Sequence, residues 1–173
     1  EHCKKYDIPH VVKDTSVFDL AKDKIRKNSS SCSFFSRMRR GYLYSTAKEL
    51  GCNKVALGHH MDDAAESFFM NFIYNGQMRS LAPKYTSGNG LVVIRPLIQM
   101  RERQLSAFVM DNDIYAIGDE LCPSMYFEEK MPHARANTKV MLAKMEKDFP
   151  SLFTSLNAAF KNISVDSFFM HEE

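Results

Sequence analysis

Apolar residues gather along this chain in short compact runs and in longer segments with helical spacing. Residues 8–12, 54–58 and 91–94 are compact runs, which predict short strands. Pro9 places the first run at a sheet edge or a strand entrance, because proline cannot donate a ladder hydrogen bond. The other two runs are expected to be buried. Strands that alternate with helices predict an α/β fold with a parallel sheet and helices on its faces.

Between and after these runs, apolar residues recur every three or four positions, which predicts helices. The helices are expected at residues 15–25, 36–50, 101–111, 134–147 and 151–160, with one more between Gly58 and Gly76. Thr15 or Ser16 is placed to cap the first of them, and Gly51 is placed to end the second. Three aromatic residues on the helix before Gly76 are expected in the core: Phe68, Phe69 and Phe72.

The pattern changes after Pro123, where only helices are expected. Residues 1–120 are therefore predicted to form a partial α/β domain, and residues 121–173 a C-terminal helical extension. The first residues lack an initiator Met and look like the last turns of a helix, so the sequence is expected to begin inside a domain.

The bulk composition fits a folded domain in the cytoplasm. Hydrophobic residues make up 45% of the 173, which is enough to build a core, and charged residues make up 25%. No apolar run approaches the roughly 20 residues that a membrane helix needs, and four scattered cysteines make a poor disulfide framework. The 23 basic and 21 acidic residues give a net charge of +2, which neither demands nor excludes a nucleic-acid partner.

The most informative segment is residues 57–67, which lies between a predicted strand and a predicted helix. Ligands of open α/β sheets bind at this end of a strand. Gly58 permits close approach to the backbone, helix N–H groups attract anions, and Asp62 and Asp63 can hold a magnesium ion. A structural alternative is open, because Asp63 and Glu66 suit a helix start and form an acidic version of the capping box.

A basic cluster opens the second expected helix: Arg37, Arg39 and Arg40. At about 100° per residue, Arg39 and Arg40 fall on either side of the apolar stripe, whereas Arg37 points further towards solvent. Cations in the first turns of a helix are disfavoured by its dipole and need an anionic partner. A phosphate is one candidate, and an ion pair with Asp62 or Asp63 is the structural alternative.

Several motifs together resemble the PP-loop ATPases that thiolate tRNA, and among them the enzymes that make 2-thiocytidine in the anticodon loop. The likeness runs over about half the chain in matching order and spacing. It is carried by Cys32-Ser33, residues 36–41, residues 44–51, Leu57-Gly58-His59-His60, Asp62-Asp63 with Glu66, Asn71 with Tyr74 and Gly76, Pro83-Lys84, Ile94-Arg95-Pro96-Leu97, and Arg101-Glu102.

The resemblance implies a Rossmann-like adenine nucleotide α-hydrolase (PP-loop) fold, which adenylates a tRNA base with ATP and Mg²⁺ and then delivers sulfur to it. Gly58, His59, Asp62 and Asp63 would belong to the nucleotide and magnesium region. The resemblance also implies that Arg39 acts near the activated base and that Asp62 is a catalytic acid. The implied partners are tRNA and a sulfur donor, either a protein or sulfide, and a homodimer is compatible with them.

Two features of the sequence depart from this family. The family's phosphate loop, Ser-Gly-Gly-Lys-Asp-Ser, has no counterpart in these 173 residues, so the chain alone is not expected to bind ATP tightly. The family's two Cys-x-x-Cys pairs keep one thiol each, Cys32 and Cys122, because Phe35 and Met125 occupy the second positions. Phenylalanine offers no ligand and methionine only a weak thioether, so a stable iron–sulfur cluster is not expected here.

Three functions are compatible with the sequence. The first is an ATP-dependent tRNA sulfurtransferase of which this chain is a portion. The second is an enzyme of the same fold that adenylates another substrate without cluster chemistry, and the third is a non-catalytic homologue that binds tRNA or nucleotide. An intact phosphate loop upstream of Glu1 would favour either enzyme, and a degraded one would favour the binding protein.

Overall fold

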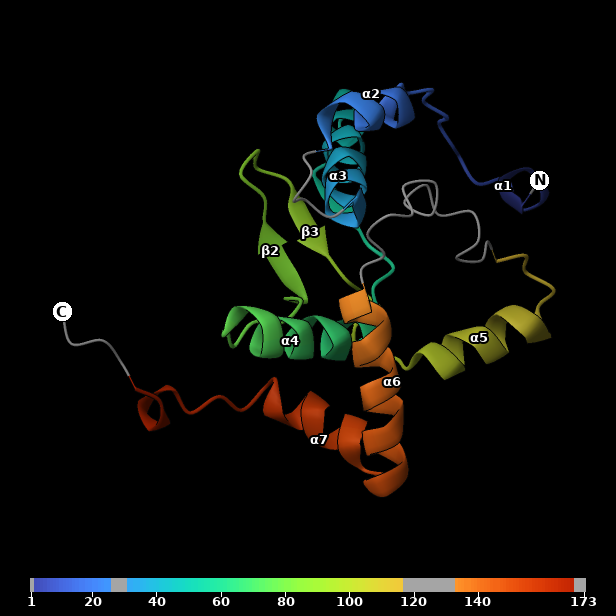
Figure 1. Ribbon diagram of the computed structural model, residues 1–173. Helices are drawn as coiled ribbons and strands as arrows, with labels where there is room; N and C mark the ends of the chain where they lie inside the picture. Colours follow the sequence, from blue (N-terminus) through green and yellow to red (C-terminus); the bar gives the residue numbers. More distant parts are fainter. Residues whose placement is uncertain (1, 26–30, 117–132, 170–173) are drawn as a thin grey trace. The chain divides into compact units, whose positions relative to one another are not determined.

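The computed structural model describes residues 2–25, 31–116 and 133–169, and most of these residues are helical (Figure 1). The elements in chain order are α1 (His2–Lys5), α2 (Val17–Lys24), α3 (Ser31–Glu49), β1 (Lys54–Ala56), α4 (Met61–Asn75), β2 (Lys84–Thr86), β3 (Val92–Ile94), α5 (Glu102–Asp111), α6 (His133–Asp148), α7 (Leu152–Ala159) and a 3-10 helix (Val165–Ser167). The helices expected from apolar spacing are all present, with ends that differ by a few residues.

Three short strands form one sheet in the order β1-β3-β2. β1 and β3 run parallel, because the N–H of Val92 donates to the carbonyl of Asn53 (3.1 Å) and that of Leu57 donates to the carbonyl of Ile94 (2.9 Å). Helix α4 follows β1 in the chain, and α5 follows β3. This arrangement of a parallel strand pair with helices confirms the expected α/β fold class.

The third strand makes the sheet mixed, and the apolar pattern does not predict it. β2 and β3 form an antiparallel hairpin (Figure 1), closed by hydrogen bonds from Ser87 N–H to Leu91 (2.9 Å) and from Arg95 N–H to Pro83 (2.8 Å). Gly90 in the turn has φ of 84°, a left-handed conformation that glycine adopts without steric cost. β2 is only three residues long, and the side chains at its two ends are exposed, so it carries no apolar run to detect.

The chain divides into two compact units, each assembled from separate stretches of sequence. The first unit comprises Glu1–Val55, Thr86–Val93 and Arg103–His133, and the second comprises Ala56–Tyr85, Ile94–Glu102 and Ala134–Glu173. The domain boundary predicted between residues 120 and 121 lies in the stretch 117–132, outside the described residues, and it stays a prediction.

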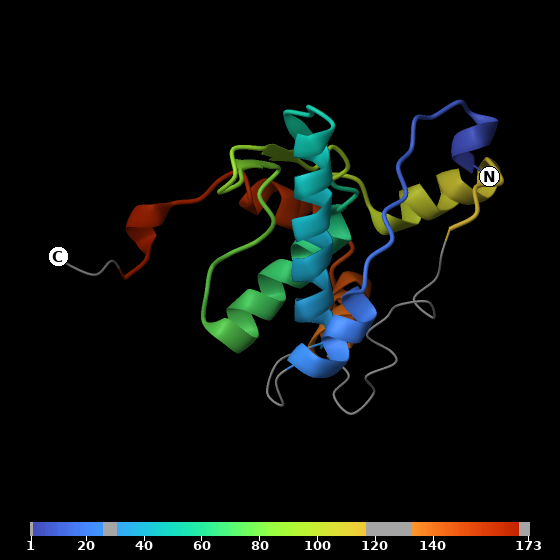
Figure 2. The ribbon, with the colours of Figure 1, turned by 90° about the horizontal axis from the view of Figure 1, so that it is seen from above.

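In the first unit, α2 packs against α3 (Figure 1, Figure 2). Ser16 is the N-cap residue of α2, as expected, although its side chain makes no capping hydrogen bond. Ala21 of α2 and Ala47 of α3 are buried. Gly51 ends α3 as predicted: its φ is 69°, and the next N–H, of Cys52, donates to the carbonyl of Ala47 at 2.8 Å.

In the second unit, the core is built where α4, α6 and α7 meet. Its buried members are Met61, Ala65, Leu142 and Phe153, and partly buried apolar side chains surround them: Phe69, Leu152, Leu156 and Phe160. The expectation of a core position is wrong for Phe72, whose exposed fraction is 53%. Its ring stacks on that of Phe68 (centroids 6.1 Å apart), so it covers the edge of the aromatic cluster and does not enter the core.

The strand predicted at residues 8–12 is not formed. Ile8 N–H donates to the carbonyl of Cys3, which closes the end of α1, and Val12 is 80% exposed. β-branched residues favour a strand only where a neighbouring strand and a buried face are available, and the described residues provide neither at this segment.

Helix α3 begins at Ser31, earlier than the predicted start at residue 36, so Cys32 lies in its first turn. Arg37, Arg39 and Arg40 consequently lie beyond the first turn of α3, where the helix dipole has little effect on them. No helix in the described ranges is long and apolar enough to cross a membrane.

Candidate functional site

The segment between β1 and α4 forms a tight strand-to-helix connection at the carboxyl end of the parallel strand pair. Helix α4 starts with a capping box: the N–H of His60 donates to Asp63 Oδ2 (3.0 Å), and the N–H of Asp63 donates to His60 Nδ1 (3.4 Å). The acidic capping box expected between Asp63 and Glu66 is therefore wrong, because Asp63 pairs with the preceding His60. Gly58 lies in this connection, as predicted, and a Cβ placed on it would meet no atom within 4 Å.

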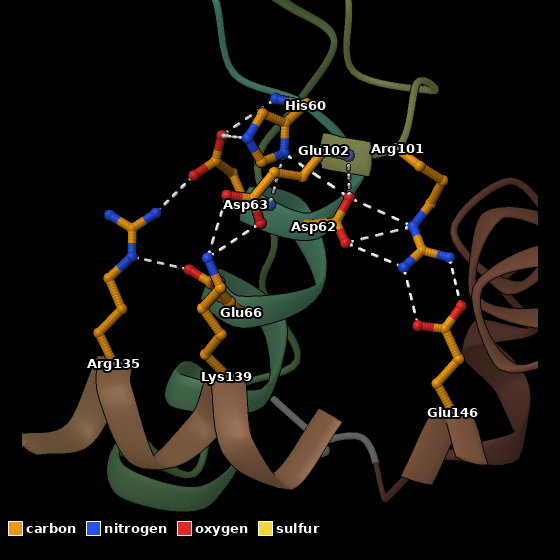
Figure 3. Close-up of polar contacts among 9 residues, drawn as sticks. All are labelled: His60, Asp62, Asp63, Glu66, Arg101, Glu102, Arg135, Lys139 and Glu146. Atoms are coloured by element: carbon orange, nitrogen blue, oxygen red, sulfur yellow. Dashed lines mark hydrogen bonds and ion pairs between the residues drawn. The ribbon is translucent and has the colours of Figure 1, made fainter. Parts of the chain in front are cut away.

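Asp62 is held by a guanidinium group and a backbone amide (Figure 3). Arg101 donates to it through Nε (3.2 Å to each oxygen) and Nη2 (3.0 Å to Oδ1), and the N–H of Glu102 donates to Oδ2 at 2.7 Å. Arg101 also binds Glu146 of α6 through Nη1 (2.6 Å) and Nη2 (3.0 Å). Its Cζ lies 3.3 Å from the ring centroid of Phe153, so the guanidinium also stacks on the core.

The electrostatics of this network favour the ionised form of Asp62. Burial by itself would raise the pKa of Asp62, but the hydrogen bonds from Arg101 and from the Glu102 N–H, with the charge of Arg101, lower it below its usual value. The two carboxylates likewise raise the pKa of Arg101 against the effect of burial. The side chains of Asp62 and Arg101 are only 14% and 15% exposed, so this is a largely buried ion pair.

A second arginine binds the other two acids of α4 (Figure 3). Arg135 of α6 donates through Nε to Glu66 Oε2 at 2.7 Å and through Nη2 to Asp63 Oδ1. Burial would lower the pKa of Arg135, but the charges of Glu66 and Asp63 and their hydrogen bonds raise it. One turn further along α6, Lys139 binds Glu102 (2.9 Å). Two arginines thus connect the start of α4 to α6. Arg101 bridges Asp62 of α4 and Glu146 of α6, and Arg135 of α6 binds Asp63 and Glu66 of α4 directly.

These contacts decide whether the acids fit a magnesium ion. Both oxygens of Asp62 accept hydrogen bonds from Arg101, and one also accepts the Glu102 N–H. The oxygens of Asp63 accept from Arg135 and from the His60 N–H. Within the described residues, no group of three or more His, Cys, Asp or Glu side chains could hold a metal ion. Asp62 and Asp63 therefore do not fit as magnesium ligands in this arrangement.

The basic cluster of α3 belongs to the first unit. The side chains of Arg37, Arg39 and Arg40 are exposed, and Arg40 Nε donates to the carbonyl of Ser36 (3.2 Å). Asp62 and Asp63, which the sequence offered as ion-pair partners for this cluster, are bound by arginines of their own unit. Their helical phase predicted that Arg39 and Arg40 lie beside a buried face, but both side chains are exposed.

The backbone of Cys32 lies in α3, while its side chain and all of Cys122 lie outside the described residues. Phe35, which stands one helical turn after Cys32, is partly buried, and its ring makes an edge contact with Phe34 (centroids 5.7 Å apart). An apolar ring packed in this way contributes no ligand at that position.

Three participants in the network are not predicted from the sequence: Arg135, Lys139 and Glu146, all on α6. Arg101 is named in the sequence only as part of the Arg101-Glu102 pair that carries the family resemblance. The spacing of Arg135 and Lys139, four residues apart, places them on one face of a helix. That spacing carries no information about which acids the face meets.

The chain belongs to the PP-loop domain family, whose model matches residues 1–128. Its relatives include proteins named tRNA-cytidine(32) 2-sulfurtransferase. It is 35% identical to the one from Ralstonia nicotianae over 94% of this chain and 51% of the relative. It is 38% identical to the one from Aliivibrio fischeri (strain MJ11), over 94% of this chain and 52% of the relative. The chain thus spans about half the length of these curated relatives.

A solved structure has the same fold. It is the U34-tRNA thiolase NcsA from Methanococcus maripaludis with its [4Fe-4S] cluster, which superimposes with a TM-score of 0.68. The match covers 98% of this chain and 58% of the thiolase at 19% sequence identity. The similarity establishes the PP-loop fold for these residues, and at this identity it does not extend to the ligands of the thiolase.

Proposed function

We propose that this chain is part of an ATP-dependent tRNA sulfurtransferase of the cytoplasm. The whole protein would adenylate a cytidine in the tRNA anticodon loop and then deliver sulfur to that base from a donor protein or from sulfide. The observation that carries this proposal is the identity of 35–38% to tRNA-cytidine(32) 2-sulfurtransferases over 94% of the chain. Within the protein, residues 1–120 would belong to the α/β domain and residues 121–173 to a helical extension.

In this proposal the nucleotide region is the connection between β1 and α4, which contains Gly58 and His59 and leads to Asp63. Its position at the carboxyl end of a parallel strand pair is where α/β folds bind ligands. ATP with Mg²⁺ is the proposed cofactor of the whole protein. No magnesium ligand is assigned to Asp62 or Asp63, since their oxygens already accept hydrogen bonds.

Asp62 and Arg39 are the proposed catalytic residues, and the geometry limits what Asp62 can do. A carboxylate whose pKa is lowered and which is bound by an arginine is a poor proton acceptor at neutral pH. Asp62 would therefore act as a fixed negative charge. Arg39 is exposed on α3, as a residue that contacts a tRNA base or phosphate must be.

A second function is favoured by the packing of Phe35. Where the resembled family has a cysteine, this side chain is a partly buried ring against Phe34, and Met125 replaces the other cysteine. A PP-loop homologue without cluster chemistry fits these two substitutions. It would either adenylate another substrate or bind tRNA or nucleotide without catalysis.

Mass spectrometry of nucleosides tests the proposal. The full-length protein is incubated with unmodified tRNA, ATP and sulfide, and the products are AMP and 2-thiocytidine. Formation of both supports the sulfurtransferase. AMP that depends on tRNA, or on another substrate, without any thiolated base would replace it with the cluster-free adenylating enzyme. Retention of tRNA with neither product would leave the binding protein.

A further inference from the structure

Arg95 is a buried arginine at the carboxyl end of β3. Its exposed fraction is 8%, and it directly follows the residue whose carbonyl pairs with the end of β1. Its own N–H donates to the carbonyl of Pro83 (2.8 Å), so the backbone of Arg95 is fixed in the β2–β3 hairpin. A buried guanidinium needs partners for its donors, and those partners define what the residue does.

Within the described ranges, three contacts fix the guanidinium of Arg95. Nη1 donates to the carbonyl of Ala82, just before β2, and the group lies over the ring of Tyr85 in β2, with Cζ 5.3 Å from the ring centroid. The third contact leaves the hairpin: Nε donates to Nδ1 of His59 at 3.2 Å. Arg95 therefore reaches from the hairpin to the connection between β1 and α4.

The contact with His59 determines the protonation of that imidazole. Arginine is always protonated in proteins, so Arg95 Nε–H can only donate, and His59 Nδ1 must accept with its lone pair. In a neutral imidazole the single proton then lies on Nε2. We propose that Arg95 is a positioning residue, which holds His59 as the neutral tautomer protonated at Nε2 and fixes the orientation of its ring.

The consequence for binding rests on the proposed function of the β1–α4 connection. In this tautomer Nε2–H can only donate, so a hydrogen bond made at Nε2 must be to an acceptor. The guanidinium charge on the other side of the ring favours an anionic acceptor. The chemical class that fits is an oxyanion, such as a phosphate oxygen of an adenine nucleotide.

Nitrogen chemical shifts of the histidine rings test the tautomer without any substrate. Full-length protein with ¹⁵N-labelled histidine is measured by long-range ¹H–¹⁵N correlation, and His59→Gln identifies the signals. In the wild type, His59 should show a non-protonated Nδ1 and a protonated Nε2. In Arg95→Met, which cannot donate, both shifts should move towards the average of the two tautomers. Arg95→Lys, which keeps a donor, should restore part of the difference.

His60 supplies the matched control in the same spectra. Its Nδ1 accepts from the N–H of Asp63 (3.4 Å), a contact independent of Arg95, so its shifts should stay unchanged in both variants. A wild-type His59 protonated at Nδ1 would overturn the proposal, and so would an unchanged His59 tautomer in Arg95→Met. If Arg95→Met fails to fold, the His59 nitrogen shifts of the wild type and of Arg95→Lys still test the proposed tautomer. A purely structural Arg95 would alter stability and leave the tautomer in place.

A double-mutant cycle connects the tautomer to function. If His59 acts through the donor that Arg95 orients, His59→Gln should reduce tRNA-dependent AMP formation far less in the Arg95→Met protein than in the wild type. Fully additive losses would contradict the coupling. Absence of AMP formation in the wild type would instead reject the proposed function, while the nitrogen shifts would still decide the tautomer.

Discussion

Two helices of this chain, α3 and α4, carry clustered like charges in their N-terminal halves, and the two clusters differ in exposure and in ion pairing. The acids of α4, Asp62, Asp63 and Glu66, are all bound by arginines from elsewhere in their own unit. The arginines of α3 are exposed, and none of the ion pairs found among the described residues includes Arg37 or Arg39. The acids of α4 are therefore already neutralised by ion pairs within the fold, whereas the arginines of α3 remain available to an anionic partner.

The difference teaches that a charged motif at a predicted ligand site can have a structural role first. Asp62 lies where the sequence predicts it, at the end of a strand that leads into a helix. Its carboxylate is nevertheless part of a cross-link through Arg101 to Glu146.

The largest effect is expected from Arg101→Ala. The change leaves Asp62 and Glu146 largely buried without a counter-charge, so it should lower the free energy of unfolding by about 3 kcal/mol. The measurement is urea unfolding followed by circular dichroism. Lys139→Ala is the matched control, because the side chains of Lys139 and its partner Glu102 are 59% and 41% exposed, and an exposed pair is worth up to about 1 kcal/mol. Equal losses in the two variants would contradict the distinction.

Arg39→Ala should act on function and not on stability. In the full-length protein we expect tRNA modification to fall about tenfold, which corresponds to about 1.4 kcal/mol. The free energy of unfolding should change by less than about 0.5 kcal/mol, because the side chain is exposed. Arg37→Ala on the same helix is the comparison. Parallel losses of activity and stability in Arg39→Ala would assign it a structural role.

The titration of Asp62 should appear in the pH dependence of stability. Its folded-state pKa is lowered from the ordinary 3.8, so its contribution is present in full above that value and is lost as the pH falls through the lower folded pKa. Asp62→Asn lacks this contribution. Its unfolding free energy should therefore depend less steeply on pH in the acid range than that of the wild type. Identical slopes would mean that Asp62 is not held by its partners in solution.

Iron binding is expected to be small. After anaerobic reconstitution, iron and acid-labile sulfide should stay well below four per chain, because Phe35 and Met125 replace two cysteines of the resembled family. The double variant Phe35→Cys, Met125→Cys should bind more. Near-stoichiometric loading of the wild type that disappears in Cys32→Ser would disprove this expectation and strengthen the sulfurtransferase.

The smallest effect is expected from ATP added to the isolated 173-residue chain. Calorimetric titration should detect no binding at micromolar concentrations, since these residues contain no glycine-rich phosphate loop. A micromolar or tighter dissociation constant would show that other residues of this chain hold the phosphates.

Local patterns predict much of this fold, and tertiary pairing accounts for what they miss. The segment from β1 to Gly76 is predicted because a buried run, a polar connection and a helical stripe follow one another within a short stretch. Residues 8–12 have the same kind of composition but pair with no strand in the part of the chain that the structure describes. The exposure of Phe72 and the pairing of Arg135 with Glu66 depend on where α6 and α7 pack, which no local period encodes.

The ion pairs at the start of α4 also determine when this unit can be completed. Asp62 meets Arg101 across 39 positions of the chain, and Glu66 meets Arg135 across 69. Closing loops of this length costs entropy before any contact forms, so such non-local pairs slow folding. During synthesis, α4 leaves the ribosome well before α6. Asp63 and Glu66 must then remain hydrated until Arg135, in the last quarter of these residues, has been made, and the second unit is expected to fold late.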